Sequence, residues 1–230
     1  FTHVYGQENL FIEEGAKIRA AIIDAESGPV YIGKNATVNE GAIIKGPFAL
    51  CEGSSLTMGA KIRNATTIGP YSNVGGEVKN SIVLGYSNKG HDGYMGNSSL
   101  GEWCNLGADT NTSNLKNTFD NVKVWSYVSE QMEQTDQLNC GLIMGDHSKA
   151  GINTMFNTAT VVGVCVNLFG GSFPEKHIPS FSWKNETNTF QLNRAIEMAN
   201  RMMALKNIKM SKEDQDIFNY INWHSDRFRF

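Results

Sequence analysis

Aliphatic residues recur at every sixth position over a long stretch of the chain. Four positions after each of them stands a residue that is mostly small, such as Ala, Ser or Thr. A period of six fits neither a helix nor a flat strand, but it is typical of the hexapeptide repeat of a parallel β-helix. The pattern predicts three short strands per coil, with aliphatic side chains stacked inside a three-sided column. The regular aliphatic positions are Ile32, Val38, Ile44, Leu50, Leu56, Ile62, Ile68 and Val74.

The same spacing continues beyond this stretch, with two breaks. It returns at Leu100 and Leu106 and again from Met144 to Leu168, and it begins at Ile12 and Ile18, two residues out of register. We therefore predict a β-helix over about residues 10–170. Two irregular segments, around residues 79–94 and 112–141, are expected to leave the column as loops. Loops held by a rigid scaffold are where functional residues gather.

The pattern changes after Leu168. The segment "GGSFPEKHIPSFSW" carries two prolines and predicts an irregular strap. Apolar residues then share one face of a helix over about 188–206, and Ser211 with Asp214 has the pattern of an N-terminal cap for a second helix. We expect this helical pair to cover the open strand edges at the end of the column. The chain is thus divided into a β-helix at 1–170 and a strap with two helices at 171–230.

Composition excludes several classes of partner. The chain has 20 basic and 23 acidic residues, a net charge of −3, which offers no electrostatic footprint for nucleic acid. No apolar run approaches the length that spans a bilayer, so no membrane partner is expected and we predict a cytoplasmic location. The four cysteines form no CxxC pair, which favours reduced thiols. Because the chain begins with Phe1 and not Met, it is expected to be a piece of a longer protein.

A filled column leaves no internal cavity, so any site must lie outside, against a loop or a neighbouring subunit. This argues for an oligomer, and three flat faces suit threefold symmetry. The segment "GHDGYMG" places His91 between glycines, without aliphatic neighbours to bury it. An imidazole there can accept a proton from an amine or hydroxyl at neutral pH. His147, in "GDHSKAG", is the competing histidine, but it falls at a turn of a regular hexad and is the weaker candidate.

A resemblance adds to this interpretation. The run "GHDGYMGNSSLGEWCNLGADTNTSNLKN", with "IGPYSNVGGEVKNSIV" before it and "GDHSKAGINTMFNTATVVG" after it, resembles the left-handed β-helix acyltransferase domain of bifunctional sugar-1-phosphate nucleotidyltransferases. Bacterial glucosamine-1-phosphate acetyltransferase/N-acetylglucosamine-1-phosphate uridylyltransferase and its archaeal relatives belong to that family. The similarity covers about residues 10–170. It implies a left-handed all-β solenoid, a homotrimer, acetyl-CoA as co-substrate, no metal for acyl transfer, and a place in UDP-N-acetylglucosamine biosynthesis.

The resemblance also implies roles for individual residues. The family's H-x-x-Y loop supplies a general base and a contact to the sugar phosphate, an Asn lies near the acceptor amine, and a backbone amide approaches the acetyl-CoA thioester. Further Lys and Asn side chains contact the substrate. These roles suit a base, cationic groups for phosphate and an N–H for the developing oxyanion. The matching positions are His91 (base), Tyr94 (sugar phosphate), Asn105 (near the amine), Ala108 (thioester), and Lys79, Asn114 and Lys123 (substrate).

Three positions depart from the family pattern. Asp109 replaces a Gly beside the thioester channel and adds a negative charge there. Cys51 stands where we match a phosphate-gripping Arg of the family, and Asp120 stands where archaeal relatives have a Lys. The family's Gly-rich nucleotide loop has no counterpart in these 230 residues, so this chain by itself is not expected to transfer a nucleotidyl group.

Three hypotheses follow. The first is acetyl-CoA-dependent acetylation of an amino sugar, with a hexosamine 1-phosphate as acceptor. The second is a catalytically inactive β-helix that serves as a trimerisation or regulatory domain of a sugar-1-phosphate nucleotidyltransferase, motivated by Asp109, Cys51 and Asp120. The third, a β-helical carbonic anhydrase, needs three zinc-binding histidines, and the predicted coils offer only His91 and His147.

Overall fold

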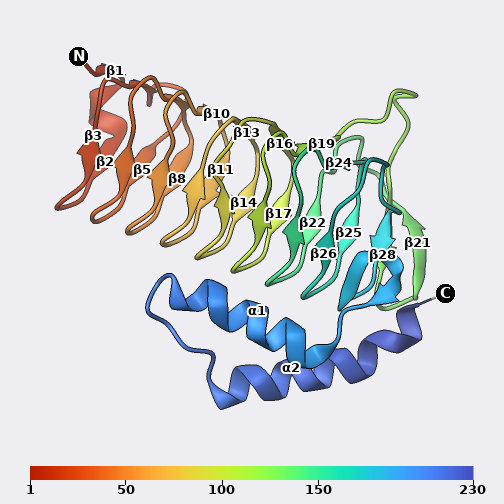
Figure 1. Cartoon of the computed structure of the whole chain (residues 1–230). Coiled ribbons are helices and arrows are strands. Elements are labelled where there is room, and N and C mark those ends of the chain that lie inside the picture. Colours follow the sequence, from red (N-terminus) through yellow and green to blue (C-terminus); the bar gives the residue numbers. More distant parts are fainter. Residues whose placement is uncertain (230) are drawn as a thin grey trace.

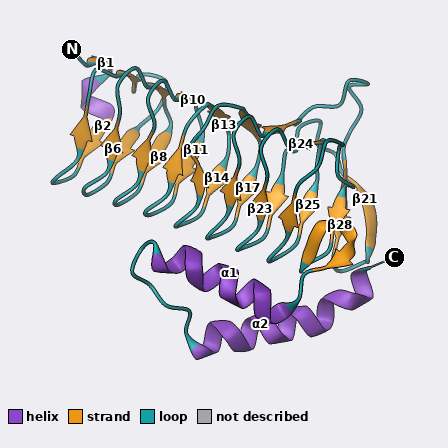
Figure 2. Cartoon of the chain, in the orientation of Figure 1, coloured by secondary structure: helices purple, strands orange, loops and turns teal. Residues whose placement is uncertain are grey.

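The computed structural model describes residues 1–229, without the side chains of 185–188. The chain winds into a three-sided parallel β-solenoid, and two helices run along one side of it (Figure 1, Figure 2). Three parallel sheets form the walls, and each strand pairs with the strand one coil before it. The predicted parallel β-helix is therefore confirmed.

The strands fall into the three walls as follows. The first sheet contains β1 (His3–Tyr5), β4 (Ile22–Asp24), β7 (Ile43–Lys45), β10 (Lys61–Arg63), β13 (Glu77–Lys79) and β16 (Tyr94–Gly96). The second contains β2 (Leu10–Ile12), β5 (Val30–Ile32), β8 (Phe48–Leu50), β11 (Thr66–Ile68), β14 (Ile82–Val83), β17 (Ser99–Leu100), β22 (Ile143–Met144), β25 (Val161–Val162) and β27 (His177–Ile178). The third contains β3 (Lys17–Ile18), β6 (Thr37–Val38), β9 (Ser55–Leu56), β12 (Asn73–Val74), β15 (Asn88–Lys89), β18 (Asn105–Leu106), β23 (Lys149–Ala150), β26 (Asn167–Leu168) and β28 (Ser182–Thr189).

Besides the three walls, the described residues form four further strands and two short 3-10 turns. A parallel pair, β19 (Asn111–Thr112) with β24 (Met155–Phe156), continues the column. An antiparallel hairpin, β20 (Lys123–Ser126) with β21 (Gln131–Gln134), lies outside the three walls, against the last coils. The 3-10 turns are η1 (Gln7–Asn9) and η2 (Asp226–Phe228). The hairpin lies inside the second predicted interruption, 112–141, which does leave the column as expected.

The aliphatic repeat fills the interior. All eight regular positions from Ile32 to Val74 are buried, and so are the small residues four positions after them, such as Ala36, Ala42 and Ala60. Ile44 lies in register beside Ile62, and Val38 beside Leu56, so like side chains stack from coil to coil. Burial of this apolar surface supplies the main stabilising free energy of the column.

The prediction of a first interruption is wrong. Residues 79–94 do not leave the column, because β14 and β15 pair in parallel with the strands before and after them. The coil that carries them is shorter: Val83 pairs with Ile68 only fifteen positions earlier, whereas Ile68 pairs with Leu50 eighteen positions earlier. The shortened coil shifts the hexad register. The sequence pattern there resembles a loop, although the chain stays in the column.

The predicted end of the β-helix at residue 170 is too early. Beyond it, β27 pairs with β25 and β28 pairs with β26, so strands continue through residue 189. Strands also begin before residue 10, because β1 pairs with β4. The division of the chain into two domains stays a prediction.

The two helices occur where the sequence predicted them. They are α1 (Leu192–Ala204), whose Ala195, Ala199 and Met203 are buried, and α2 (Lys212–Ser225). Ser211 and Asp214 form the expected capping box at the start of α2. Their expected place is wrong, however: the helices lie along the side of the column and do not cover its end (Figure 1).

A ladder of aromatic rings explains why the helices bind the side. Tyr71, Tyr86, Trp103 and His147 occupy successive turns at one corner of the column, each with a positive φ, and their rings stack. Trp103 and the corner residues Cys165 and Phe181 form a second hydrophobic cluster with the apolar faces of both helices. The corner is an apolar strip that one amphipathic helical pair covers.

Two further observations bear on the predictions from composition. Each of the four cysteines is free, as expected. Among residues 1–229, no helix has both the length and the apolar character to cross a membrane, and no group of three or more His, Cys, Asp or Glu could hold a metal ion.

Candidate functional site

The outer face of the first sheet carries a group of polar side chains near its C-terminal edge. Strand alternation turns Ile62, Val78 and Met95 inward, where they are buried. Their neighbours along each strand face out, and the parallel register places Arg63 directly beside Lys79. Adjacent strands lie about 4.8 Å apart, so a guanidinium and an ammonium share one small patch.

Glu77 orients the guanidinium of Arg63. Its carboxylate accepts a hydrogen bond from the Arg63 Nη1 at 2.8 Å. Glu77 is also in register with Tyr94 on the next strand. Arg63, Lys79, Glu77 and Tyr94 therefore lie on one face of three successive strands, and three of the four carry charge.

The Tyr94 hydroxyl has a defined place on this face. A Cβ on Gly96 would collide with it, so the ring lies over a position that has room only because it is glycine. The hydroxyl also hydrogen-bonds the Asn114 side chain, whose Nδ2 donates to Asn97 Oδ1 at 2.6 Å. Burial, together with the negative charge of Glu77, raises the pKa of the Tyr94 phenol, so it stays a hydrogen-bond donor at neutral pH.

His91 lies at the corner between the third and first sheets, between β15 and β16, with an exposed side chain. It is thus part of a coil and not of an extruded loop, contrary to the prediction. Its exposure does match the prediction that no aliphatic residues bury it. The corner brings His91 to the edge of the sheet that carries Tyr94, Lys79 and Arg63.

Ala108 lies at the equivalent corner one coil further on, in a turn closed by a hydrogen bond from Thr110 N to Gly107 O at 3.3 Å. Its carbonyl accepts from Asn153 N at 2.8 Å, whereas its own N–H has no hydrogen-bond partner within residues 1–229. A half-buried, unpaired N–H at a fixed corner can donate to an incoming oxygen. Asp109 follows with an exposed carboxylate that accepts from Asn111 Nδ2 at 3.3 Å.

Asn105 belongs to a ladder of amides on the outer face of the third sheet. Asn73 Nδ2 donates to Asn88 Oδ1 at 3.0 Å, and Asn88 Nδ2 donates to Asn105 Oδ1 at 2.8 Å. The ladder lines a groove of about 350 Å³ whose opposite wall is made by Met198 and Met202 of α1. Asn105 therefore stands on a different sheet from Lys79 and Tyr94, one strand beyond the coil that carries His91.

Lys123 is not brought to the other predicted residues by any contact in the described part of the chain. It is exposed in β20, and the β20–β21 hairpin lies against the last coils, where the Trp125 ring stacks on His177 with centroids 3.9 Å apart. That contact holds the hairpin to the second sheet. The remaining departure, Asp120, forms an exposed ion pair with Lys116 at 3.6 Å.

Two residues of this region were missed from the sequence. The first is Arg63, which supplies the second cation of the patch. Cys51, which was matched to a family Arg, stands elsewhere, half-buried just after β8 of the second sheet. Counting inward positions would have found Arg63, since it follows the buried Ile62 as Lys79 follows Val78. Lys89 was also missed: it is buried in the column interior, at a position the repeat reserves for an aliphatic residue.

His147, the competing histidine, is enclosed. Its ring stacks on Trp103, with centroids 6.1 Å apart, and meets the edge of Phe218 of α2. Burial, with a smaller effect of the Lys149 charge, lowers the pKa of His147 to about 3. A neutral imidazole under a helix is poorly placed to act on a substrate, which agrees with its lower ranking.

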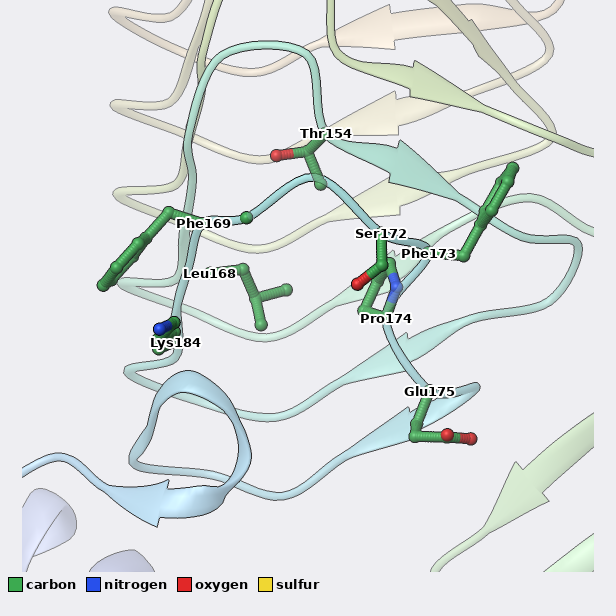
Figure 3. A pocket seen from close by; sticks show the side chains of 9 residues that line it. Thr154, Leu168, Phe169, Ser172, Phe173, Pro174, Glu175 and Lys184 are labelled. Atoms are coloured by element: carbon green, nitrogen blue, oxygen red, sulfur yellow. The ribbon is translucent and has the colours of Figure 1, made fainter.

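Another hollow, of about 230 Å³, lies nearer the C-terminal end of the column (Figure 3). Phe169 and Phe173 stand on opposite sides of it, and Lys184 and Glu175 supply opposite charges. It contains none of the residues predicted for the site.

Comparison with known proteins finds bifunctional transferases among the relatives of this chain. The chain is 40% identical over 87 residues to the bifunctional protein GlmU of Methanocaldococcus jannaschii (38% of this chain, 21% of the relative) and 27% identical over 188 residues to that of Trichodesmium erythraeum (81% and 34%). It is 26% identical over 177 residues to the bifunctional sugar-1-phosphate nucleotidylyltransferase/acetyltransferase of Sulfurisphaera tokodaii (76% and 42%). No family model matches the sequence.

The chain thus spans less than half the length of these relatives. They are bifunctional transferases, and the solenoid fits a hexapeptide-repeat acetyltransferase domain.

Proposed function

We propose, from the homology to bifunctional sugar-1-phosphate transferases, that this chain transfers an acetyl group from acetyl-CoA to the amine of a hexosamine 1-phosphate. The relatives are longer, and in this proposal the chain supplies the acyl-transfer part of such a protein. One observation carries the proposal most strongly. Arg63 and Lys79 lie side by side, next to the Tyr94 hydroxyl and at the edge of the corner that carries His91.

The cationic pair is suited to a phosphate group. A guanidinium offers paired donors to two phosphate oxygens, and an ammonium adds a compact charge. In the proposal the phosphate of the sugar binds between Arg63 and Lys79. Tyr94 donates its hydroxyl to the same ligand, and Asn114 supports that hydroxyl.

The reaction needs a base, an oxyanion donor and a leaving group. His91 accepts a proton from the acceptor amine as its nitrogen attacks the thioester carbonyl. The C–N bond forms, the negative charge on the carbonyl oxygen is stabilised by the Ala108 N–H, and the C–S bond then breaks. Coenzyme A leaves as the thiol, because its sulfur takes up the proton that His91 accepted from the amine. Asn105 is assigned to the acceptor side, and no metal is needed for these steps.

A trimer is part of the proposal. The column interior is filled, so the site is external, and in the proposal another copy supplies a second wall over the first-sheet face. Ile22 and Ile43 lie in register on the outer face of the first sheet and are 40% and 45% exposed. An exposed aliphatic row on a flat face is typical of a subunit contact. Native mass spectrometry should give three times the mass of 25.4 kDa. Lys123 is expected to reach the substrate only in that assembly.

The test is coenzyme A release from acetyl-CoA, followed with a thiol reagent. Glucosamine 1-phosphate, galactosamine 1-phosphate and glucosamine serve as acceptors, because only the first two carry the phosphate for Arg63 and Lys79. His91→Ala should lower kcat at least about a hundredfold, since a general base contributes that much or more. His3→Ala, which changes another exposed histidine, is the matched control. Equal turnover of His91→Ala and wild type would refute the proposal.

A second function, an inactive trimerisation or regulatory scaffold, is favoured by one observation. The Asp109 carboxylate is exposed at the corner next to Ala108, where it opposes an approaching anionic coenzyme A. Calorimetry with acetyl-CoA separates the two functions, because a scaffold gives no heat of binding. If Asp109→Gly creates binding that wild type lacks, the scaffold function is correct.

A further inference from the structure

A lysine interrupts the aliphatic stack inside the column. The third sheet turns one residue per coil inward, and Lys89 lies in register with Val74 at such a position. On its other side follows Leu106 of β18. The Lys89 side chain is 1% exposed. At the equivalent positions of the other coils from β6 to β26, the buried inward residues are aliphatic: Val38, Leu56, Val74, Leu106, Ala150 and Leu168.

The ammonium of Lys89 bridges two successive corners. Its Nζ donates to Gly75 O at 3.1 Å and to His91 O at 2.9 Å. The first carbonyl belongs to the corner one coil earlier, and the second belongs to the proposed general base. Burying an ammonium costs several kcal/mol unless hydrogen bonds satisfy it. Burial lowers the pKa of Lys89 to about 8, opposed by the charges of Asp92 and Asp109.

The two corners differ in width. Four positions lead from the inward Val74 to the inward Val78, whereas six lead from Lys89 to Met95. The wider corner therefore lies over the narrower one. A Cβ on Gly76 would lie 2.6 Å from Gly93 O and 2.9 Å from His91 O, so the backbones touch without side chains between them. At Gly76 the His91 corner therefore rests on backbone and not on an apolar side chain.

We propose that Lys89 is a positioning residue of the acyl-transfer site, whose ammonium fixes the backbone of the His91 corner to the coil beneath it. This rests on the proposed function of His91. Lys89 does not touch substrate, because it is enclosed in the column. A leucine would pack better in the apolar interior. The role of the lysine is therefore to hold the His91 corner and not to fill the core.

Lys149 provides a matched control. Its Nζ also donates to two carbonyls, those of Trp103 at 3.0 Å and His147 at 2.9 Å, but at the corner that faces the helices. Both lysines therefore lose two similar hydrogen bonds on replacement by Met. Only the hydrogen bonds lost in Lys89→Met hold the corner of His91.

The experiment compares Lys89→Leu, Lys89→Met and Lys149→Met with wild type by amide hydrogen exchange and by thiol release. Three amides report on the corner: Glu77 N donates to Gly93 O, Asp109 N to Asp92 O, and Tyr94 N to Asn111 Oδ1. Lys89→Leu and Lys89→Met should exchange these amides at least about tenfold faster, with the first and second sheets elsewhere unchanged. Their kcat should fall about tenfold or more, with KM for the sugar phosphate within about twofold of wild type. Lys149→Met should change neither.

The two readouts separate the two claims. Exchange needs no activity, so a wild-type protein that transfers no acetyl group refutes the proposed function while the exchange data still decide whether Lys89 holds the corner. Unchanged exchange in both Lys89 variants overturns the inference, and so does faster exchange with an unchanged kcat. Lys89→Met keeps an unbranched chain of similar length in case the Leu variant does not fold.

Discussion

Acid should destabilise this protein through His147. The imidazole is 7% exposed, lies between Trp103 and Phe218, and has a folded-state pKa of about 3 because burial disfavours its charged form. The charge of Lys149 lowers this pKa further, and that of Asp214 opposes the shift. In the unfolded chain the group returns to about 6.5. The unfolded state therefore binds a proton more readily below pH 6.5, and stability falls as the pH falls.

The magnitude follows from the two pKa values. At pH 5 the unfolded imidazole is about 1.5 pH units below its pKa while the folded one is still neutral, so this group alone costs about 2 kcal/mol. That figure does not depend on the exact folded value. The full effect, complete below about pH 3, approaches 5 kcal/mol.

Urea unfolding at pH 7 and pH 5 measures this loss, with His147→Asn as the comparison. Asn suits the position because Asn35 adopts a positive φ of 54° at the same corner of an earlier coil, close to the 58° of His147. The variant loses the same packing energy at both pH values. The carboxylates that both proteins share contribute equally to the change in unfolding free energy, so their effect cancels in the comparison. Wild type should lose about 2 kcal/mol more than the variant between pH 7 and 5. Equal losses would show that His147 is solvated, and that α2 does not cover it.

The remaining predictions concern the column, the helices and the sugar-phosphate face. Leu56→Ala removes a fully buried side chain and should cost about 2–5 kcal/mol of unfolding free energy, measured by urea titration; a cost under 1 kcal/mol would contradict the filled interior. Ser211→Ala deletes the cap of α2 and should cost about 0.5–2 kcal/mol in the same assay, with no change meaning that α2 is held by packing alone. Gly96→Ala should displace the Tyr94 hydroxyl and raise KM for the sugar phosphate roughly fivefold, the cost of about one hydrogen bond, while an unchanged KM would remove Tyr94 from the site.

The fold could be predicted because one simple physical rule governs most of it. A column whose coils repeat every eighteen residues turns the same positions inward each time, so Ile32 to Val74 reveal the walls directly. The rule fails where a coil changes length. Between Ile68 and Val83 the repeat shortens to fifteen residues, and a count by sixes then assigns inward residues to a loop.

The place of the helices could not be predicted from their own sequence. Their apolar faces show that they bind something, and both the open end of the column and its side offer unsatisfied surface. The choice depends on Tyr86 and Trp103, which occur in separate coils and form one apolar strip only after the column has wound. A signal existed, since each stands shortly after a glycine, Tyr86 after Gly85 and Trp103 after Gly101, but it can be interpreted only when the coil register is known.

The sequence indicates only some residues of the candidate site, because strand register is not visible in it. His91, Tyr94 and Asn114 stand out by motif, whereas Arg63 is related to Lys79 only through strand register. Lys89 escaped notice because its neighbours in sequence are polar, and only the folded column shows that it points inward. Side chains that act together across coils are separated by fifteen to eighteen residues, so their proximity is a property of the winding.

In the proposed function, the first-sheet face and the His91 corner bind an amino sugar phosphate for acetyl transfer. The most direct measurement is an experimental structure of the protein with glucosamine 1-phosphate. We expect the phosphate between Arg63 and Lys79, with the amine turned toward His91. A ligand bound instead in the hollow beside Lys184, or in the groove beneath α1, would contradict it.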